Sequence, residues 1–241
     1  MKIKKYIPDA ITSMNLLCGA IGVVAVSQGK IELAFLFMIG GAAFDFFDGF
    51  SARMLGAYSP MGKELDSLAD DITFGLLPAY MMYSVGSKAG MGLWAFAALL
   101  IAVFSGLRLA KFNIDERQTT SFLGVPTPAC AMICGSLSCY MAYYGSSSAL
   151  ASLLAANGWA FAALCVILSL LLVSEIPMFS MKMHKGEGMS ADMVRRIIFA
   201  AASLAALIYT FAAGRHWTLA VLIAFTSYII INLIRWPKTR Q

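Results

Sequence analysis

Four aspartates stand in one short stretch of this chain as two pairs, Asp45 with Asp48 and Asp66 with Asp70. Residues three or four apart share a face of a helix, so Asp45 and Asp48 would project together, as would Asp66 and Asp70. Two facing helices would then bring four carboxylates to one cavity. Carboxylate oxygens are the ligands that Mg²⁺ and Mn²⁺ prefer. The spacing therefore predicts a site for divalent cations and a phosphate-bearing ligand.

The composition makes these carboxylates costly to keep. Of the 241 residues, 60% are hydrophobic and 13% are charged, against about 25% charged residues in a soluble domain. The chain is therefore expected to be an integral membrane protein. A charged side chain at the centre of a membrane helix costs roughly 2.5–3.5 kcal/mol on insertion scales. Four aspartates in such a setting indicate a functional site that faces water, metal or a charged ligand.

Small and basic residues are interleaved with the aspartates. Gly49, Ala52 and Gly62 remove bulk where a ligand or a second helix must approach closely. Arg53 offers a planar fork that matches phosphate oxygens. Two divalent cations about 4 Å apart would clamp a diphosphate for in-line displacement. The residues alone leave open a structural ion-pair network, or a cation transporter lined by carboxylates, although neither explains the embedded glycines.

The hydrophobic pattern predicts the elements that position this site. A spanning helix needs about 20 mostly apolar residues. We predict an all-α, polytopic membrane bundle of about eight transmembrane helices, forming a single membrane domain over residues 1–241. The candidate helices are residues 10–28, 31–53, 63–86, 91–112, 125–144, 156–175, 195–213 and 216–234.

The distribution of Lys and Arg predicts the orientation of the bundle. With the N-terminus in the cytoplasm, 15 of the 18 basic residues fall inside, and only Lys30, Lys88 and Arg215 fall outside. Both termini and the aspartates would then face the cytoplasm. The inner basic residues would also attract anionic membrane lipids. We expect no nucleic-acid partner.

The eight defined positions resemble the signature of the CDP-alcohol phosphotransferase family. These positions are Asp45, Asp48, Gly49, Ala52, Arg53, Gly62, Asp66 and Asp70, called the aspartate frame below. The resemblance implies an integral membrane enzyme with two divalent cations, Mg²⁺ or Mn²⁺. Asp45, Asp48 and Asp66 would be the main metal ligands. Asp70 would be the general base and could also touch a metal.

The same resemblance implies a nucleotide site beside the metals. Gly49, Ala52, Arg53 and Gly62 would line the cytidine diphosphate site. Thr12 and Asn15, which share a face of the first helix, would join them. The family core would span residues 10–144, and residues 145–241 would add further transmembrane helices.

Segments around the frame resemble the bacterial, membrane-embedded phosphatidylserine synthases. The segments are residues 7–15, 64–70, 108–113 and 122–129. This narrower resemblance implies transfer of a phosphatidyl group from CDP-diacylglycerol to the hydroxyl of L-serine, giving phosphatidylserine and CMP. It also implies a homodimer in the bacterial cytoplasmic (inner) membrane. Another acceptor, glycerol 3-phosphate or an inositol compound, stays open.

Three residues near the end of the fourth predicted helix are candidates for binding the acceptor. Arg108 and Lys111 are three residues apart, and either could bind a serine carboxylate or a lipid phosphate, or only anchor the helix at the inner face. Lys111 stands where this group is expected to carry arginine, so it keeps the charge and loses the fork. Asn113 could donate a hydrogen bond to the acceptor or cap the helix.

Overall fold

The computed structural model describes residues 6–114, 122–179 and 191–235. The described chain is a helical bundle with one short pair of strands, which confirms the all-α membrane class. The helices are α1 (Ile7–Ser27), α2 (Ile31–Leu55), α3 (Pro60–Asp70), α4 (Leu77–Lys88), α5 (Leu99–Ile114), α6 (Thr127–Tyr144), α7 (Ala149–Ala156), α8 (Gly158–Val173), α9 (Ala191–Ala212) and α10 (Thr218–Arg235).

Two irregular helical turns interrupt the regular helices. A π-helical turn, Asp71–Leu76, joins α3 to α4, and a 3₁₀ turn, Gly92–Ala98, leads into α5. The strands β1 (Phe122–Leu123) and β2 (Pro177–Met178) pair antiparallel, with Phe122 opposite Met178. The expected helices 63–86 and 91–112 run through the two irregular turns, because an apolar stretch does not distinguish a π or 3₁₀ turn from a regular α-helix.

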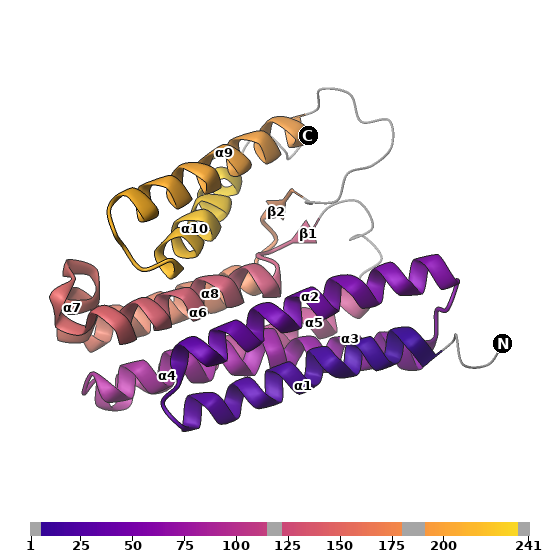
Figure 1. The fold of residues 1–241 in the computed structure, drawn as a ribbon, viewed down its shortest axis with the longest axis horizontal. Coiled ribbons are helices and arrows are strands. Elements are labelled where there is room, and N and C mark those ends of the chain that lie inside the picture. Colours follow the sequence, from indigo (N-terminus) through magenta and orange to yellow (C-terminus); the bar gives the residue numbers. More distant parts are fainter. Residues whose placement is uncertain (1–5, 115–121, 180–190, 236–241) are drawn as a thin grey trace.

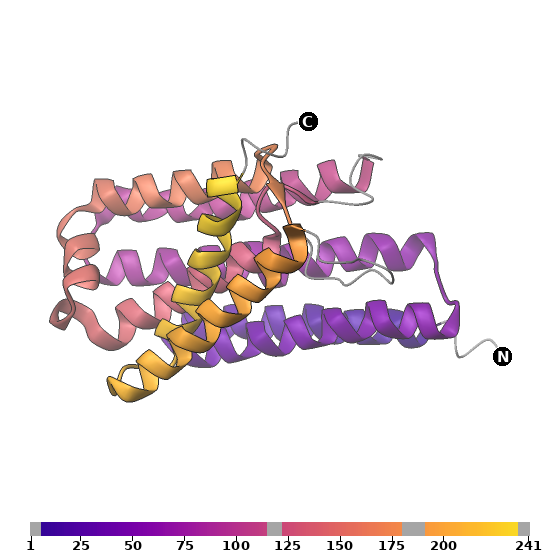
Figure 2. The ribbon, with the colours of Figure 1, turned by 90° about the horizontal axis from the view of Figure 1, so that it is seen from above.

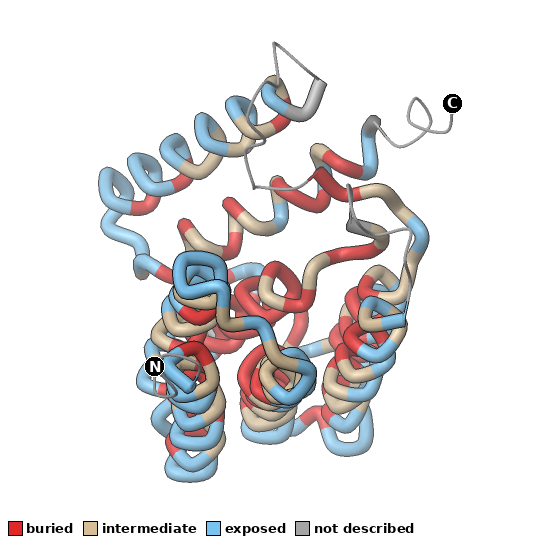
Figure 3. Tube along the Cα trace, turned by 90° about the vertical axis from the view of Figure 1, so that its right-hand side faces the viewer, coloured by how far each residue is buried: buried red, intermediate tan, exposed pale blue. Residues whose placement is uncertain are grey.

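The helices form two parts. Helices α1 to α6 and α8 run roughly along the long axis of the molecule (Figure 1), and the C-terminal hairpin of α9 and α10 crosses one face of this bundle obliquely (Figure 2). Helix α6 lies at the centre, where α4 and α10 pack against it. Its side chains are almost all buried, whereas the outer faces of the peripheral helices are exposed and apolar (Figure 3). An exposed apolar surface of this kind suits a lipid environment.

Four helical stretches within the described residues are long and apolar enough to cross a membrane, namely 7–27, 31–55, 92–114 and 193–212. A fifth span results if α7 and α8, which meet at a bend of 100°, cross together. The chain is therefore a multi-pass membrane protein. The number of eight spans remains a prediction.

Two of the differences between the observed and the expected helix boundaries follow from serine caps. The third helix starts earlier, at Pro60, because Ser59 caps it: the Ser59 hydroxyl accepts a hydrogen bond from Gly62 N at 2.9 Å. The sixth expected helix, 156–175, is α8 alone. The preceding α7 was not predicted as a separate helix, and it starts with its own serine cap at Ser148.

Candidate active site

The turn between α2 and α3 brings the two pairs of aspartates together. Helix α2 ends at Gly56, whose φ of +60° is accessible to glycine at little cost. The chain then reverses, and α3 starts at the Ser59 cap with Pro60 in its first turn. We call this end of the bundle the aspartate end; it lies at the right of Figure 1.

Three aspartates of the frame form a compact carboxylate cluster. One oxygen each of Asp45, Asp48 and Asp66 lies within 4.8 Å of the other two. Asp48 is buried, and Asp45 and Asp66 are partly buried. Asp70 is near enough that the charges of all three act on it. Like charges at this spacing repel one another, so the hard oxygen donors of the cluster fit divalent cations.

Helix α1 holds two of these acids from the side. The hydroxyl of Thr12 donates to Asp48 Oδ2 at 2.6 Å, and the amide of Asn15 donates to Asp70 Oδ1 at 3.2 Å. Thr73, in the π-helical turn, donates from its hydroxyl to the backbone carbonyl of Asn15 at 3.0 Å. Thr12 and Asn15 therefore orient acids that come from two different helices.

A cavity of about 230 Å³ opens beside the cluster, between α1, α2 and α3. Its lining includes the predicted residues Thr12, Asp48, Gly49, Ala52, Gly62 and Asp66. A methyl group on Gly49 would meet no atom within 4 Å, so this glycine leaves space open. A Cβ on Gly62 would lie 2.7 Å from Asp9 Oδ1, so a larger residue there would have to displace the Asp9 side chain.

The structure separates two predicted nucleotide-binding residues from this lining. Arg53 is exposed at the end of α2, and Asn15 lies deeper, against Asp70. The sequence reasoning also missed six residues that line the cavity: Pro8, Asp9, Ala57, Tyr58, Ser59 and Lys63. Asp9 could have been found, because it lies three residues before Thr12 and so on the same side of α1. Tyr58 and Ser59 are in the turn, which has no periodic pattern.

Arg108 is the buried basic residue next to the cluster. It is only 7% exposed, and the charge of Asp70 acts on it. Its Nη1 donates to the hydroxyl of Thr127, the first residue of α6, at 3.0 Å. Its Nε is buried without a hydrogen-bond partner in the described chain. An arginine with an unused donor at this depth is suited to bind an anionic group.

The two other acceptor candidates make contacts at the rim. Lys111 pairs with Glu175 at 3.7 Å, and both side chains are largely exposed. Asn113 donates from its side chain to the hydroxyl of Ser67 at 2.8 Å, and its carbonyl accepts from Lys63 Nζ at 3.1 Å. These bonds fasten the end of α5 to α3, so Asn113 and Lys63 tie together the two helices that flank the site.

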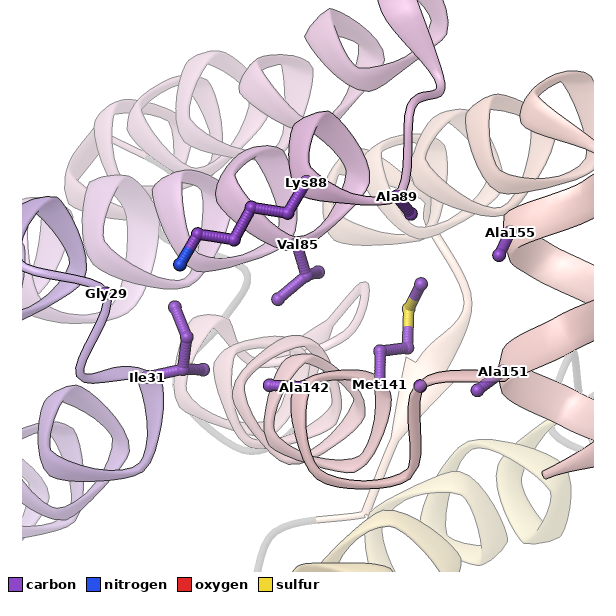
Figure 4. A pocket seen from close by; sticks show the side chains of 10 residues that line it. Gly29, Ile31, Val85, Lys88, Ala89, Met141, Ala142, Ala151 and Ala155 are labelled. Carbon is purple, nitrogen blue, oxygen red and sulfur yellow. The ribbon is translucent and has the colours of Figure 1, made fainter. Parts of the chain in front are cut away.

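A larger cavity, of about 490 Å³, lies at the opposite end of the bundle (Figure 4). It opens between the start of α2, the end of α4, and α6 and α7. Lys88 is the single charged side chain among the residues that line it, and the rest are small or apolar. Without carboxylates in its described lining this cavity does not match the predicted chemistry, and we place the candidate site at the smaller one.

Comparison with known proteins agrees with the family resemblance that the aspartate frame indicated. Residues 5–163 match the family described as CDP-alcohol phosphatidyltransferase. A Bacillus subtilis protein named CDP-diacylglycerol–serine O-phosphatidyltransferase is 41% identical over 127 residues, which are 53% of this chain and 72% of that protein. A Mycobacterium tuberculosis protein of the same name is 34% identical over 188 residues, covering 75% of this chain and 62% of that one.

A third relative, from Methanocaldococcus jannaschii, has the same name and is 33% identical over 127 residues, 57% of its length. The matches thus cover between about half and three quarters of these relatives. The family match includes the whole aspartate frame and the helices that carry it. This chain therefore belongs to the CDP-alcohol phosphatidyltransferase family.

Proposed function

We propose that this protein transfers a phosphatidyl group from CDP-diacylglycerol to the hydroxyl of L-serine, giving phosphatidylserine and CMP. The carboxylate cluster of Asp45, Asp48 and Asp66, with Asp70 beside it, is the observation that carries the proposal. The family supports a CDP-linked substrate. The shared name of the relatives from three genera supports CDP-diacylglycerol and serine as the substrates.

Two divalent cations, Mg²⁺ or Mn²⁺, are the proposed cofactors. Asp45, Asp48 and Asp66 would hold them, with Asp70 close by. Bound cations of this kind neutralise a diphosphate and the negative charge that forms on a leaving phosphate oxygen. Thr12 keeps Asp48 in place through its 2.6 Å hydrogen bond.

The cavity between α1, α2 and α3 is the proposed site for the cytidine diphosphate. Gly49, Ala52 and Gly62 give the nucleotide room to approach the backbone. Arg53, at the exposed end of α2, is proposed to reach the phosphates from outside. The acyl chains would stay in the bilayer, along the apolar outer surface of α2.

Asp70 is the proposed general base. It takes the proton of the serine hydroxyl while Asn15 holds one of its oxygens. The serine oxygen forms a bond to the lipid-side phosphorus, and the bond from that phosphorus to the CMP oxygen breaks. CMP leaves with the electron pair. Arg108 is proposed to bind the serine carboxylate, and Lys111 and Asn113 remain candidates at the rim.

The proposed setting is the bacterial cytoplasmic membrane. The 15 to 3 distribution of basic residues supports a cytoplasmic site with both termini inside. A homodimer is proposed from the resemblance to the family. CDP-diacylglycerol would then reach the site from the inner leaflet and serine from the cytoplasm.

An acceptor screen tests this function. Purified protein in detergent is given CDP-diacylglycerol with Mg²⁺ or Mn²⁺, and CMP release is followed with serine, glycerol 3-phosphate, inositol or inositol phosphate. Asp70→Asn should reduce serine-dependent release by about 10²–10⁴-fold, the usual contribution of a general base. Asp71→Asn is the matched control, because the Asp71 side chain faces α5. A Cβ added to Gly106 of α5 would lie 3.5 Å from Asp71 Oδ1.

Each outcome of the screen has a defined meaning. Release that needs metal and serine, and that is lost in Asp70→Asn alone, supports the proposal. Release with a different acceptor keeps the family and overturns serine. Near-normal turnover in Asp70→Asn would show that Asp70 is not the general base. If no acceptor gives CMP release, the cation transporter becomes the better explanation.

A further inference from the structure

Helix α10 holds the backbone that follows β2. Tyr228 and Asn232 are each 1% exposed, four residues apart and so on one face of α10. The hydroxyl of Tyr228 donates to the carbonyl of Phe179 at 3.0 Å. Asn232 Oδ1 accepts from the backbone N–H of Phe179 at 3.0 Å. The backbone N–H and the backbone carbonyl of Phe179 are therefore both hydrogen-bonded to side chains of one helix, α10.

The segment held by α10 is bonded in turn to the start of α6. Strand β2 pairs with β1, and Gly124 N donates to the carbonyl of Ile176 at 2.9 Å. Val125 N donates to the carbonyl of Leu171 at 3.0 Å. Gly124 has a φ of +77°, and a Cβ there would lie 2.8 Å from the carbonyl oxygen of Ser174. The two backbones therefore lie in close and specific contact.

Thr127, two residues after Val125, is the hydrogen-bond acceptor for Arg108. The Tyr228 phenol is also within electrostatic range of the Arg108 guanidinium. Arg108 is oriented by Thr127, which is linked through β1 and β2 to the residue that α10 holds. Helix α10 lies beyond residues 5–163, which match the family.

We propose that Tyr228 is a positioning residue for the acceptor: its bond to Phe179 fixes β2, and through β1 and Thr127 it keeps Arg108 aligned for the serine carboxylate. This inference rests on the proposed function. It gives the C-terminal hairpin, which crosses the bundle over this region (Figure 2), a part in selecting the acceptor. Tyr228 itself does not touch the substrate.

Steady-state kinetics with Tyr228→Phe tests the inference. Loss of the hydroxyl should raise KM for serine about 3- to 10-fold, the range expected for one hydrogen bond. KM for CDP-diacylglycerol and kcat should stay within about twofold, because the carboxylate cluster is untouched. Tyr209→Phe is the matched control, since it removes a hydroxyl from α9 of the same hairpin at a residue that is 55% exposed.

A double variant separates positioning from general stability. If Tyr228 acts through Arg108, then Tyr228→Phe should raise serine KM much less in an Arg108→Lys background than in the wild type. Equal effects in both backgrounds overturn the inference. An unchanged serine KM in Tyr228→Phe, or an equal rise in KM for both substrates, overturns it as well.

Amide hydrogen exchange provides a readout that needs no activity. The Gly124 amide should exchange faster in Tyr228→Phe than in Tyr209→Phe, because its acceptor, the carbonyl of Ile176, directly precedes the strand β2 that Tyr228 holds. Unchanged exchange overturns the inference even if the wild type accepts no substrate. If the wild type uses an acceptor other than serine, the serine proposal fails, and the KM comparison with that acceptor decides the role of Tyr228.

Discussion

At the residue scale, the site depends on neutral side chains that support its acids. Thr12 and Asn15 come from α1, yet each donates to an aspartate of another helix. Side chains that hydrogen-bond metal ligands fix the orientation of the ligand, and their loss typically costs about 10–100-fold in metal affinity or activity. Helix α1 therefore contributes to the site although it carries none of the four frame aspartates.

Thr12→Val should weaken cation binding. Valine has nearly the same shape but leaves Asp48 Oδ2 without the hydroxyl that donates to it at 2.6 Å. We expect the Mg²⁺ concentration for half-maximal activity to rise about 10-fold or more. Ser13→Ala is the control, because among the described residues the Ser13 hydroxyl bonds within α1, to the carbonyl of Asp9 at 2.8 Å. An unchanged Mg²⁺ requirement in Thr12→Val would rule out this supporting role.

The frame residues could be predicted because their chemistry is visible in their types and spacing. Asp45, Asp48 and Asp66 do converge, as the helical period indicated. Thr127 could not be assigned in this way, since nothing in its local sequence shows that Arg108, 19 residues earlier, donates to it. The contact depends on how α5 and α6 pack.

At the element scale, glycines allow α1, α2 and the π-helical turn to pack closely behind the acids. A Cβ on Gly41 would lie 2.6 Å from Thr73 Cγ2 and 2.8 Å from Asn15 Oδ1. A Cβ on Gly19 would clash with the Thr73 hydroxyl. Small residues at helix contacts are common where membrane helices approach closely. Here the close approach lets Asn15 reach Asp70.

Gly41→Ala should therefore impair the protein where Gly40→Ala does not. The added methyl group in Gly41→Ala must displace Thr73 or Asn15. Overpacking of this kind costs roughly 1–3 kcal/mol of stability. At Gly40 the nearest atom to a Cβ is Cys18 Sγ, at 3.8 Å, which is an ordinary contact. Thermal unfolding in detergent and serine-dependent CMP release measure both effects. Equal stability and equal CMP release in the two variants would show that the helices around Gly41 accommodate an added methyl group.

The long apolar helices could be predicted from the sequence, and the irregular elements could not. Apolar length alone indicated α1, α2 and the stretch 92–114. The β1–β2 pair is only two residues long in each strand and exists through contacts between segments over 50 residues apart. The bend of 100° between α7 and α8 falls at Asn157-Gly158, a turn signal that marks a break but does not give its angle.

At the scale of the whole molecule, the C-terminal hairpin is fastened to the bundle near both ends of α10. At the end opposite the aspartates, Trp217 Nε1 donates to Glu32 Oε1 at 2.8 Å, and His216 Nε2 lies 3.4 Å from the same oxygen. His216 N donates to the hydroxyl of Tyr144 at 2.8 Å. The Trp217 ring also stacks on Phe35, with the ring centroids 5.5 Å apart.

Trp217→Phe should lower stability without affecting the acceptor. It removes the indole N–H and keeps an aromatic ring, so we expect a loss of about 0.5–1.5 kcal/mol and a fall in Tm of a few degrees. Serine KM should not change, because this contact is at the far end from the carboxylate cluster. Trp159→Phe, at a 62% exposed position on α8, is the control. A shift in serine KM with Trp217→Phe would indicate coupling along the hairpin.

The π-helical turn at Asp71–Leu76 sets how α3 is oriented relative to α4. Such a turn commonly accommodates one residue more than a regular helix would, and each residue of an α-helix corresponds to a rotation of roughly 100°. A one-residue deletion here would turn α3, with Asp66 and Asp70, by about 100° relative to α4 without changing any residue of the aspartate frame. The orientation of these two acids is thus encoded in the length of the turn as well as in residue type.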